Sequence, residues 1–336
     1  MKKITIIFLT ILFLVLGFFI FLFFTPISET TDDNSDYTWG ITFSKTFSQD
    51  MGLDFRDVYT SMLEDLNPDV VRLPLYWKDI EPQEGVYLFD DYDWMISEAK
   101  KNNVKLVLAV GQKLPRWPEC QIPEWTDPLS KEQKKEEIIH LIDKIVRRYG
   151  DFDNIYAWQV ENEPFLHFGK CDRFNRDFLD EEIETVRLLD PSRPIMMTDS
   201  GELGTWFSAT KRADIFGTSV YRIIWNKYFG YFEYPLPPNF FWFKANLLRI
   251  FYPDKPIIIS ELQMEPWGPK MIYETPLSEQ EISMNLDQFH SNIEYAKKTG
   301  FKEIYLWGVE LWYWMKEKHD QPELWEATKE LINKGR

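Results

Sequence analysis

The sequence has 336 residues, of which 44% are hydrophobic and 17% aromatic, with a formal net charge of −16 and a pI of about 4.8. So acidic a surface repels phosphate backbones, which argues against nucleic acid as a partner. After an apolar N-terminal segment, the remaining length suits one α/β barrel, typically of about 250 residues or more, better than two ordinary domains.

Residues 4–24 form an apolar segment interrupted only by Thr5, Thr10 and Gly17. At about 1.5 Å per residue, a helix of this length spans roughly 30 Å, the thickness of a bilayer core. Lys2 and Lys3 precede it, so we expect the N-terminus in the cytoplasm and the rest of the chain outside. A cleaved signal peptide is the alternative, although no A-x-A pattern follows. We therefore predict a transmembrane signal anchor at 1–24, a polar tether at 25–36 and one domain at 37–336.

From Tyr37 onward, short β-rich runs alternate with amphipathic segments, a pattern typical of parallel strands joined by helices. The predicted strands are Thr38–Phe43, Val70–Pro74, Lys105–Val110, Ile155–Val160, Pro194–Thr198, Ile215–Val220, Pro256–Ser260 and Glu303–Trp307. The predicted helices are Phe55–Leu66, Tyr92–Asn102, Lys131–Tyr149, Phe174–Leu189, Glu279–Lys298 and Pro322–Lys334. Eight strands with helices between them predict a (β/α)8 barrel of the TIM type.

The segment from Tyr221 to Tyr252 is crowded with aromatic residues and fits this alternation less well. We expect it to hold a long loop after the sixth strand, followed by a helix. On the face that carries the loops after the strands, this segment has three interpretations: packing on itself, a platform for sugar rings, or contact with a membrane surface.

Two glutamates close predicted strands. Glu163 follows the fourth strand in the run Glu161-Asn162-Glu163-Pro164, and Glu261 follows the Ile-rich seventh strand. Charged residues at the ends of barrel strands lie at the mouth, where catalytic groups are found. Cleavage of a glycosidic bond needs two carboxyl groups, one to protonate the leaving oxygen and one to attack the anomeric carbon or activate water.

The Asn-Glu-Pro motif and the strand ending in Glu261 resemble the clan A glycoside hydrolases, a superfamily of retaining β-glycosidases built on (β/α)8 barrels. Arg72, Tyr221 and Trp307 end the second, sixth and eighth predicted strands, where cellulase-like members carry an arginine, a tyrosine and a tryptophan. The resemblance covers nearly the whole chain after the tether.

This resemblance implies that Glu163 is the acid/base and Glu261 the nucleophile. Arg72 and Tyr221 would then donate hydrogen bonds to ionised Glu261, while burial and that negative charge would raise the pKa of Glu163. Asn162 would bind the sugar 2-hydroxyl, and Trp307 would form the floor beneath the reacting sugar.

Other residues near the predicted site have open roles. Gln112 and Ser219 stand where the cellulase-like family usually has histidines, so the exact family is left open. In the loop after the third strand, Gln112 and Trp117 are either sugar contacts or loop packing, and His167 lies close to Glu163 in sequence.

Cys120 and Cys171, the only cysteines, both fall in loops that follow strands, and a disulfide and two buried thiols are both open interpretations. No metal-ligand or nucleotide-binding motif occurs, so we expect no cofactor. The resemblance implies a carbohydrate substrate. Two alternatives use the same fold: a barrel that binds glycans at the cell surface without cleaving them, and a transglycosylase that uses the same two glutamates.

Overall fold

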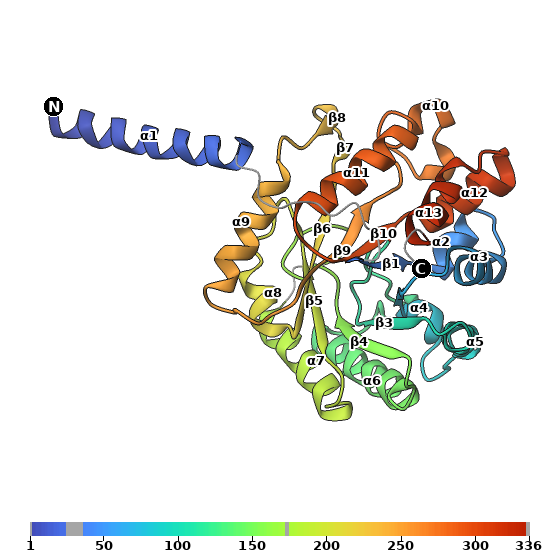
Figure 1. Ribbon diagram of the computed structural model, residues 1–336. Helices are drawn as coiled ribbons and strands as arrows, with labels where there is room; N and C mark the ends of the chain where they lie inside the picture. Colours follow the sequence, from blue (N-terminus) through green and yellow to red (C-terminus); the bar gives the residue numbers. More distant parts are fainter. Residues whose placement is uncertain (1, 25–35, 172–174, 334–336) are drawn as a thin grey trace.

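Eight parallel strands close into a barrel in the computed structural model, which describes residues 2–24, 36–171 and 175–333 (Figure 1). The strands are β1 (Thr38–Thr42), β2 (Val70–Pro74), β3 (Lys105–Val110), β4 (Ile155–Val160), β5 (Ile195–Asp199), β6 (Ile215–Val220), β9 (Ile257–Gln263) and β10 (Glu303–Trp307). Their order around the barrel is β1-β10-β9-β6-β5-β4-β3-β2. The predicted (β/α)8 barrel is therefore confirmed.

The predicted bounds of β2, β3, β4, β6 and β10 are the observed ones. The largest difference is at β9, which continues to Gln263 instead of ending at Ser260. It continues because Leu262 still pairs with both neighbours and Gln263 still pairs with Trp307 of β10. Glu261 thus lies inside a strand and not after one.

One layer of the barrel interior is made of apolar side chains from seven strands: Val70, Val107, Ala157, Met196, Ile215, Ile258 and Tyr305. The eighth strand contributes Gly40, where a Cβ would lie 2.2 Å from the ring of Tyr305. The glycine therefore makes room for the tyrosine. Two residues further along the strands, the side chains on this face include Arg72, Gln159 and Trp307, so the interior becomes polar toward the mouth.

The pairing of β9 with β6 shifts at Ser260. Thr218 pairs with Ile259 and Ser219 with Glu261, so one extra residue on β9 is left between these two pairs. Such a bulge changes the direction of the side chains that follow it. Glu261 thereby pairs with Ser219, which lies two residues after Gly217 and so faces the barrel interior. Without the bulge, strict alternation would turn Glu261 to the outer face, together with Ile259.

Helices surround the barrel (Figure 1). They are α2 (Lys45–Asp50), α3 (Phe55–Ser61), α4 (Trp77–Ile80), α5 (Asp90–Lys101), α6 (Lys131–Tyr149), α7 (Arg176–Leu189), α8 (Phe207–Arg212), α9 (Pro238–Arg249), α10 (Leu277–Gln280), α11 (Leu286–Lys298), α12 (Val309–His319) and α13 (Glu323–Asn333). The helix predicted at Lys131–Tyr149 has the observed bounds and begins with a capping box between Ser130 and Gln133.

Two predicted helices are interrupted. The one predicted at Glu279–Lys298 is two helices, α10 and α11, because the Asn285 side chain accepts the N–H of Gln288 and starts a new helix there. The one predicted at Phe55–Leu66 changes from α-helix to a π-helical turn at Met62–Leu66 and ends at Asn67, with φ of 51°.

The aromatic segment after β6 contains an antiparallel hairpin, β7 (Ile223–Asn226) and β8 (Gly230–Glu233), followed by α9. The expected helix is present, but the expected long loop is largely a hairpin. Tyr228 and Phe229 at its turn are 76% and 80% exposed. These two rings therefore do not pack inside the segment.

An apolar helix, α1 (Lys2–Phe24), extends from the barrel beside α9, where Phe18 contacts Phe243 (Figure 1). Among the described residues, no helix is long and apolar enough to cross a membrane. The predicted transmembrane helix is therefore not supported. Residues 25–35 of the predicted tether lie outside the described residues.

Candidate active site

Glu163 and Glu261 both lie at the mouth of the barrel, with exposed fractions of 7% and 5%. Glu261 is on β9, and Glu163 is in the turn that follows β4. The backbone of this turn is unusual, because Glu161 and Glu163 have φ of 59° and 41°. A residue other than glycine held at positive φ destabilises the fold by about 1–3 kcal/mol, so the surrounding contacts must hold this turn in place.

Glu261 receives two hydrogen bonds. Arg72 Nη1 lies 2.6 Å from its Oε1 in a buried ion pair, and the Tyr221 hydroxyl donates to its Oε2 at 3.0 Å. Both donors stabilise the negatively charged carboxylate. The structure thus brings together three residues that the sequence predicted to act as a unit.

Arg72 has no exposed surface and is fixed by three further acceptors, one of which is the Ser260 carbonyl at 3.4 Å. Its Nε donates to Gln159 Oε1 at 2.7 Å and its Nη2 donates to Asn162 Oδ1 at 2.8 Å. One guanidinium therefore joins the strand-end residues of β2, β4 and β9. Sequence reasoning missed Gln159, although alternation along β4 places it on the same face as Ala157.

Glu163 has a different environment. The Ser219 hydroxyl donates to its Oε1 at 2.8 Å, and its backbone N–H donates to Thr198 Oγ1 at 2.9 Å. Burial raises the pKa of Glu163 well above its usual value, and the negative charges of Glu261 and Glu119 raise it further, against the smaller lowering effects of Lys113 and Ser219. The Glu163 carboxyl group is thus protonated more readily than an ordinary glutamate.

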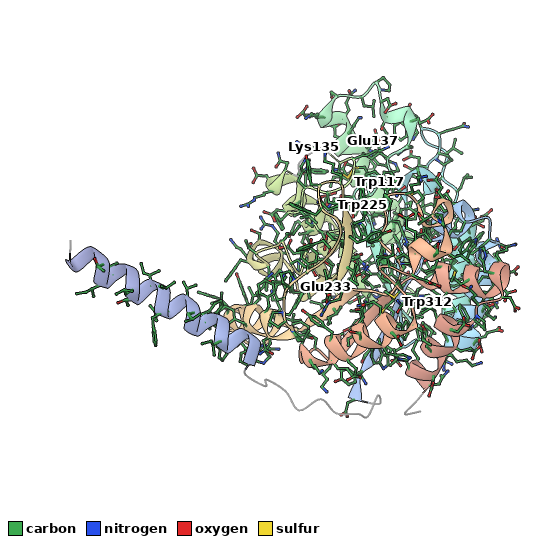
Figure 2. All side chains as sticks on the ribbon, turned by 90° about the horizontal axis from the view of Figure 1, so that it is seen from above. Trp117, Lys135, Glu137, Trp225, Glu233 and Trp312 are labelled. Atoms are coloured by element: carbon green, nitrogen blue, oxygen red, sulfur yellow. A yellow bond between two sulfur atoms is a disulfide. The ribbon has the colours of Figure 1, made fainter. Side chains whose placement is uncertain are left out.

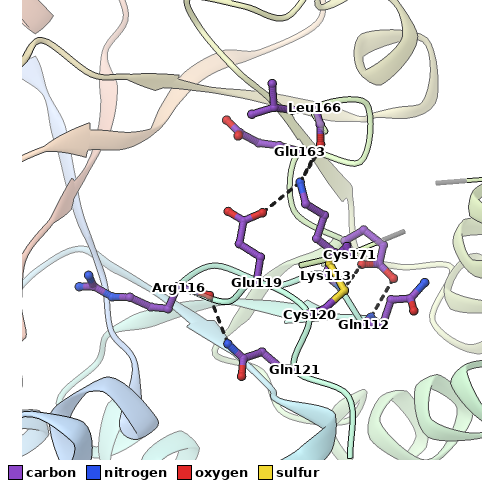
Figure 3. Close-up of a disulfide and its surroundings, with 10 residues drawn as sticks. Gln112, Lys113, Arg116, Glu119, Cys120, Gln121, Glu163, Leu166 and Cys171 are labelled. Atoms are coloured by element: carbon purple, nitrogen blue, oxygen red, sulfur yellow. Dashed lines mark hydrogen bonds and ion pairs between the residues drawn. A yellow bond between two sulfur atoms is a disulfide. The ribbon is translucent and has the colours of Figure 1, made fainter. Parts of the chain in front are cut away.

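Lys113 connects the loop after β3 with the turn that carries Glu163. Its buried ammonium donates to the backbone carbonyl of Glu163 at 2.9 Å and of Leu166 at 3.1 Å, and pairs with Glu119 at 3.1 Å (Figure 3). Burial raises the pKa of Glu119 to about 7. Glu119 is a third carboxyl group near Glu163 and Glu261 that sequence reasoning missed.

Glu161 points away from the mouth and accepts the backbone N–H groups of Gln112 at 2.8 Å and Lys113 at 2.6 Å. Its carboxylate leaves no space at Gly111, where a Cβ would lie 2.3 Å from Oε1 and φ is 120°. Glu161 therefore fixes the loop that carries Lys113. Gln112 takes part through its backbone, while His167 is exposed on the loop after β4.

Trp307 lies at the end of β10, but its ring is covered. Only 6% of the residue is exposed, and the Arg116 guanidinium lies 4.2 Å from its ring centre. Arg116 comes from the loop after β3, crosses the mouth and pairs with Glu265 and with Glu310 at 2.5 Å. A sugar stacked on this tryptophan would have to displace Arg116. The sequence analysis did not predict that Arg116 covers Trp307.

Four aromatic rings form a row beside the two glutamates. Trp117 contacts Phe168 at 6.1 Å, Phe168 contacts Trp267 at 5.7 Å, and Trp267 contacts Tyr221 at 5.1 Å between ring centres. Trp117, which comes from the loop after β3, is 50% exposed and is labelled in Figure 2. Phe168 and Trp267 were not predicted as site residues.

Cys120 and Cys171 form a disulfide with a Cα–Cα distance of 5.2 Å, which joins the loops after β3 and β4 (Figure 3). Within residues 2–24, 36–171 and 175–333, no group of three or more His, Cys, Asp or Glu side chains is arranged to hold a metal ion.

Residues 60–191 match the family described as Glycosyl hydrolase family 10. This segment contains Glu163 but not Glu261, and it covers less than half of the chain. A curated relative, the β-galactosidase BglY of Alicyclobacillus acidocaldarius, is 24% identical over 171 residues, which are 43% of this chain. The chain covers only 24% of that relative's length.

Solved structures share the barrel at low sequence identity. A β-galactosidase from Halorubrum lacusprofundi is 14% identical, with a TM-score of 0.56 over 80% of this chain and 52% of that one. A GH5_18 protein from Streptomyces cattleya, solved with GlcNAc, is 11% identical, with a TM-score of 0.58 over 81% of this chain and 70% of that one. A psychrophilic family 10 endo-β-1,4-xylanase is 18% identical, with a TM-score of 0.51 over 83% of this chain and 88% of that one. The family 10 match over residues 60–191 and the shared barrel make this chain similar to the clan A glycoside hydrolases, the resemblance that its strand-end residues predicted.

Proposed function

We propose that this chain hydrolyses β-glycosidic bonds with retention of configuration, with Glu261 as the nucleophile and Glu163 as the acid/base. The observation that carries the proposal is the difference between the two carboxyl groups. Glu261 accepts from a buried guanidinium and a phenol, which favours its ionised form. Glu163 is buried with a raised pKa, which favours its protonated form.

In the first step, the Glu261 carboxylate attacks the anomeric carbon while the Glu163 proton passes to the leaving oxygen, and the glycosidic bond breaks. In the second step, Glu163 takes a proton from water, and the resulting hydroxide displaces Glu261 from the anomeric carbon. The loss of the negative charge on Glu261 in the first step removes one of the charges that raise the pKa of Glu163. Glu163 can therefore act as a base in the second step.

Asn162 is assigned to the sugar 2-hydroxyl. Its side-chain oxygen accepts from Arg72, which leaves the amide N–H end as the donor for the sugar. Such a contact strengthens at the transition state, so it accelerates the reaction and does more than bind the substrate.

The test is hydrolysis by the full chain, purified in a mild detergent. The substrates are aryl β-glycosides, β-galactosides and β-1,4-xylan, since the relatives include β-galactosidases and a xylanase. Glu163→Ala and Glu261→Ala should each lower kcat by several orders of magnitude while leaving the circular dichroism spectrum unchanged. The anomer released first, read by proton NMR, should be β. Binding without cleavage by wild-type protein would instead favour the glycan-binding alternative.

Transglycosylation stays a second candidate, because only the acceptor that resolves the glycosyl-enzyme distinguishes it from hydrolysis. Product analysis with an added acceptor sugar separates the two. An enzyme that releases mainly free sugar at high acceptor concentration is a hydrolase.

We also propose that the barrel lies outside the cytoplasm. The Cys120–Cys171 disulfide supports this, because disulfides persist in oxidising compartments, and the apolar segment after Lys2 and Lys3 is consistent with export. Fractionation of cells and proteolysis of the intact cell surface test the location, and a protein found only in the cytosol would contradict it.

A further inference from the structure

A buried carboxyl group lies on α7, the helix that packs against β4 on the outside of the barrel (Figure 1). Glu182 has no exposed surface, and among the residues that the structure describes, neither of its oxygens meets an N–H or hydroxyl donor. The nearby glutamates on the helix, Glu181 and Glu184, are exposed to solvent. Burying a carboxylate without a partner is very unfavourable, so we expect Glu182 to keep its proton.

The proton of Glu182 has an acceptor in Glu161, a second buried carboxyl group to which Glu182 is hydrogen-bonded. Two ionised carboxylates can only accept hydrogen bonds, so this contact needs one proton between the two groups. Glu161 already accepts two backbone N–H groups, which favours its ionised form and leaves the proton on Glu182. Burial raises the pKa of Glu182 well above its usual value, and the negative charges of Glu161 and Glu181 raise it further. Burial raises the pKa of Glu161 to about 7, against the lowering effects of the hydrogen bonds it makes and of Lys113.

Lys113 connects this carboxyl pair to the acid/base, because it contacts three successive residues of the turn after β4. Its N–H donates to Glu161 Oε2 at 2.6 Å, and its carbonyl accepts the N–H of Asn162 at 2.6 Å. Its ammonium donates to the Glu163 carbonyl at 2.9 Å. The turn holds two residues at positive φ, so its shape depends on such contacts. A change in the direction of the Glu161 carboxylate would therefore move Lys113, and with it Glu163.

We propose that Glu182 is a positioning residue for the reaction. The proton that it shares with Glu161 directs the Glu161 carboxylate onto the loop after β3, and Lys113 of that loop holds Glu163 where it can protonate the leaving oxygen. Glu182 has no exposed surface, so it acts through the other residues and not on the substrate. The inference rests on the proposed function, in which Glu163 is the acid/base. A small displacement of a catalytic group, caused by a change far from the reacting atoms, can cost about a hundredfold in rate.

The experiment compares two substrates that share the reacting sugar and differ in how much they need the acid. Dinitrophenolate leaves a 2,4-dinitrophenyl β-glycoside without a proton, whereas the leaving oxygen of a phenyl β-glycoside needs one. The readout is the ratio of kcat/KM for the phenyl substrate to kcat/KM for the dinitrophenyl substrate. It is measured on the full chain with the sugar that the wild type cleaves fastest. Glu182→Leu removes the shared proton and should lower this ratio about tenfold, while kcat/KM for the dinitrophenyl substrate stays within about twofold of wild type.

Three further variants sharpen the test. Glu182→Gln donates a permanent N–H to Glu161, so it should restore most of the ratio. Glu161→Gln turns an N–H toward one of the two backbone donors and should lower the ratio as Glu182→Leu does, which keeps the test open if Glu182→Leu does not fold. Glu184→Gln, at an exposed position of the same helix, should leave the ratio unchanged. Glu182→Gln with a ratio as low as that of Glu182→Leu would overturn the shared proton.

Glu163→Ala separates this inference from the proposed function, because the loss of the acid itself should lower the ratio far more than any of these variants. If Glu163→Ala behaves so, then equal losses on both substrates in Glu182→Leu and Glu161→Gln would show a structural role and overturn the positioning role alone. Unchanged ratios in these two variants would overturn it as well. A wild-type chain inactive on both substrates, or Glu163→Ala with equal losses on both, would overturn the proposed function.

Discussion

Glu261 and Glu163 are buried to a similar extent at the same barrel mouth, but the groups that contact them differ in charge. Glu261 accepts from a cation and a phenol, whereas Glu163 accepts from one serine hydroxyl and lies near two other carboxyl groups. Since burial alone penalises the ionised form of either carboxyl group, the difference between them comes from their neighbours. The comparison shows that the different environments of the two carboxyl groups depend on β2, β6 and the loop after β3 as much as on the glutamates.

Removing the cation should have the largest effect on this difference. Arg72→Met leaves Glu261 buried without its ion pair and removes the donor to Asn162. Breaking a buried pair from one side costs about 3–5 kcal/mol of stability, and losing such a preorganised charge typically costs about 10²–10³ in kcat. Thermal unfolding and kcat on the best substrate measure the two effects. A stable variant with near wild-type kcat would show that Arg72 does not maintain the ionised nucleophile.

Tyr221→Phe should have an intermediate effect. The substitution keeps the ring on Trp267 but removes the hydroxyl donor to Glu261 at 3.0 Å. A hydrogen bond to a charged group contributes about 1.5–3 kcal/mol, which predicts a decrease in kcat of roughly tenfold to a hundredfold. Trapping of the glycosyl-enzyme with a 2-fluoro sugar should slow in parallel. Slower turnover with unchanged trapping would place the role of Tyr221 in the second step instead.

Ser219→Ala should have the smallest effect on rate and the clearest effect on pH dependence. The Ser219 hydroxyl stabilises ionised Glu163, so its removal raises the pKa of Glu163 further. A protonated acid is needed in the first step, and activity is lost as pH rises through that pKa. The alkaline limb of kcat/KM should therefore move to higher pH, while kcat/KM at the optimum falls only about twofold to fivefold. A shift to lower pH would contradict this account of Glu163.

The sequence predicted the barrel because each strand is a short apolar run with its own flanking signals. Strand-end positions pointed to Glu163 and Glu261, because such residues converge at one mouth, whereas Arg72, Tyr221 and Asn162 were expected from the family resemblance. The bulge at Ser260 and the separation of α10 from α11 depend on pairing and capping that the apolar pattern does not encode.

Arg116 and Glu119 could not be predicted in the same way. The partners of Arg116 are 149 and 194 residues away, in the loop after β9 and in the first turn of α12. Its position over Trp307 depends on a backbone with φ of 85°. Glu119 has φ of 66° in the same loop. Nothing in the local pattern distinguishes these two charges from the many solvated ones.

The joined loops after β3 and β4 also affect how this barrel can be re-engineered. In most (β/α)8 barrels each loop is attached to its own strand, so one loop can be exchanged without its neighbour. Here a graft of either loop alone would leave an unpaired thiol and remove either Gly169 or the Pro118 carbonyl that packs against it. The two loops therefore constitute one exchangeable module, and a library that varies the mouth should recombine them as a pair.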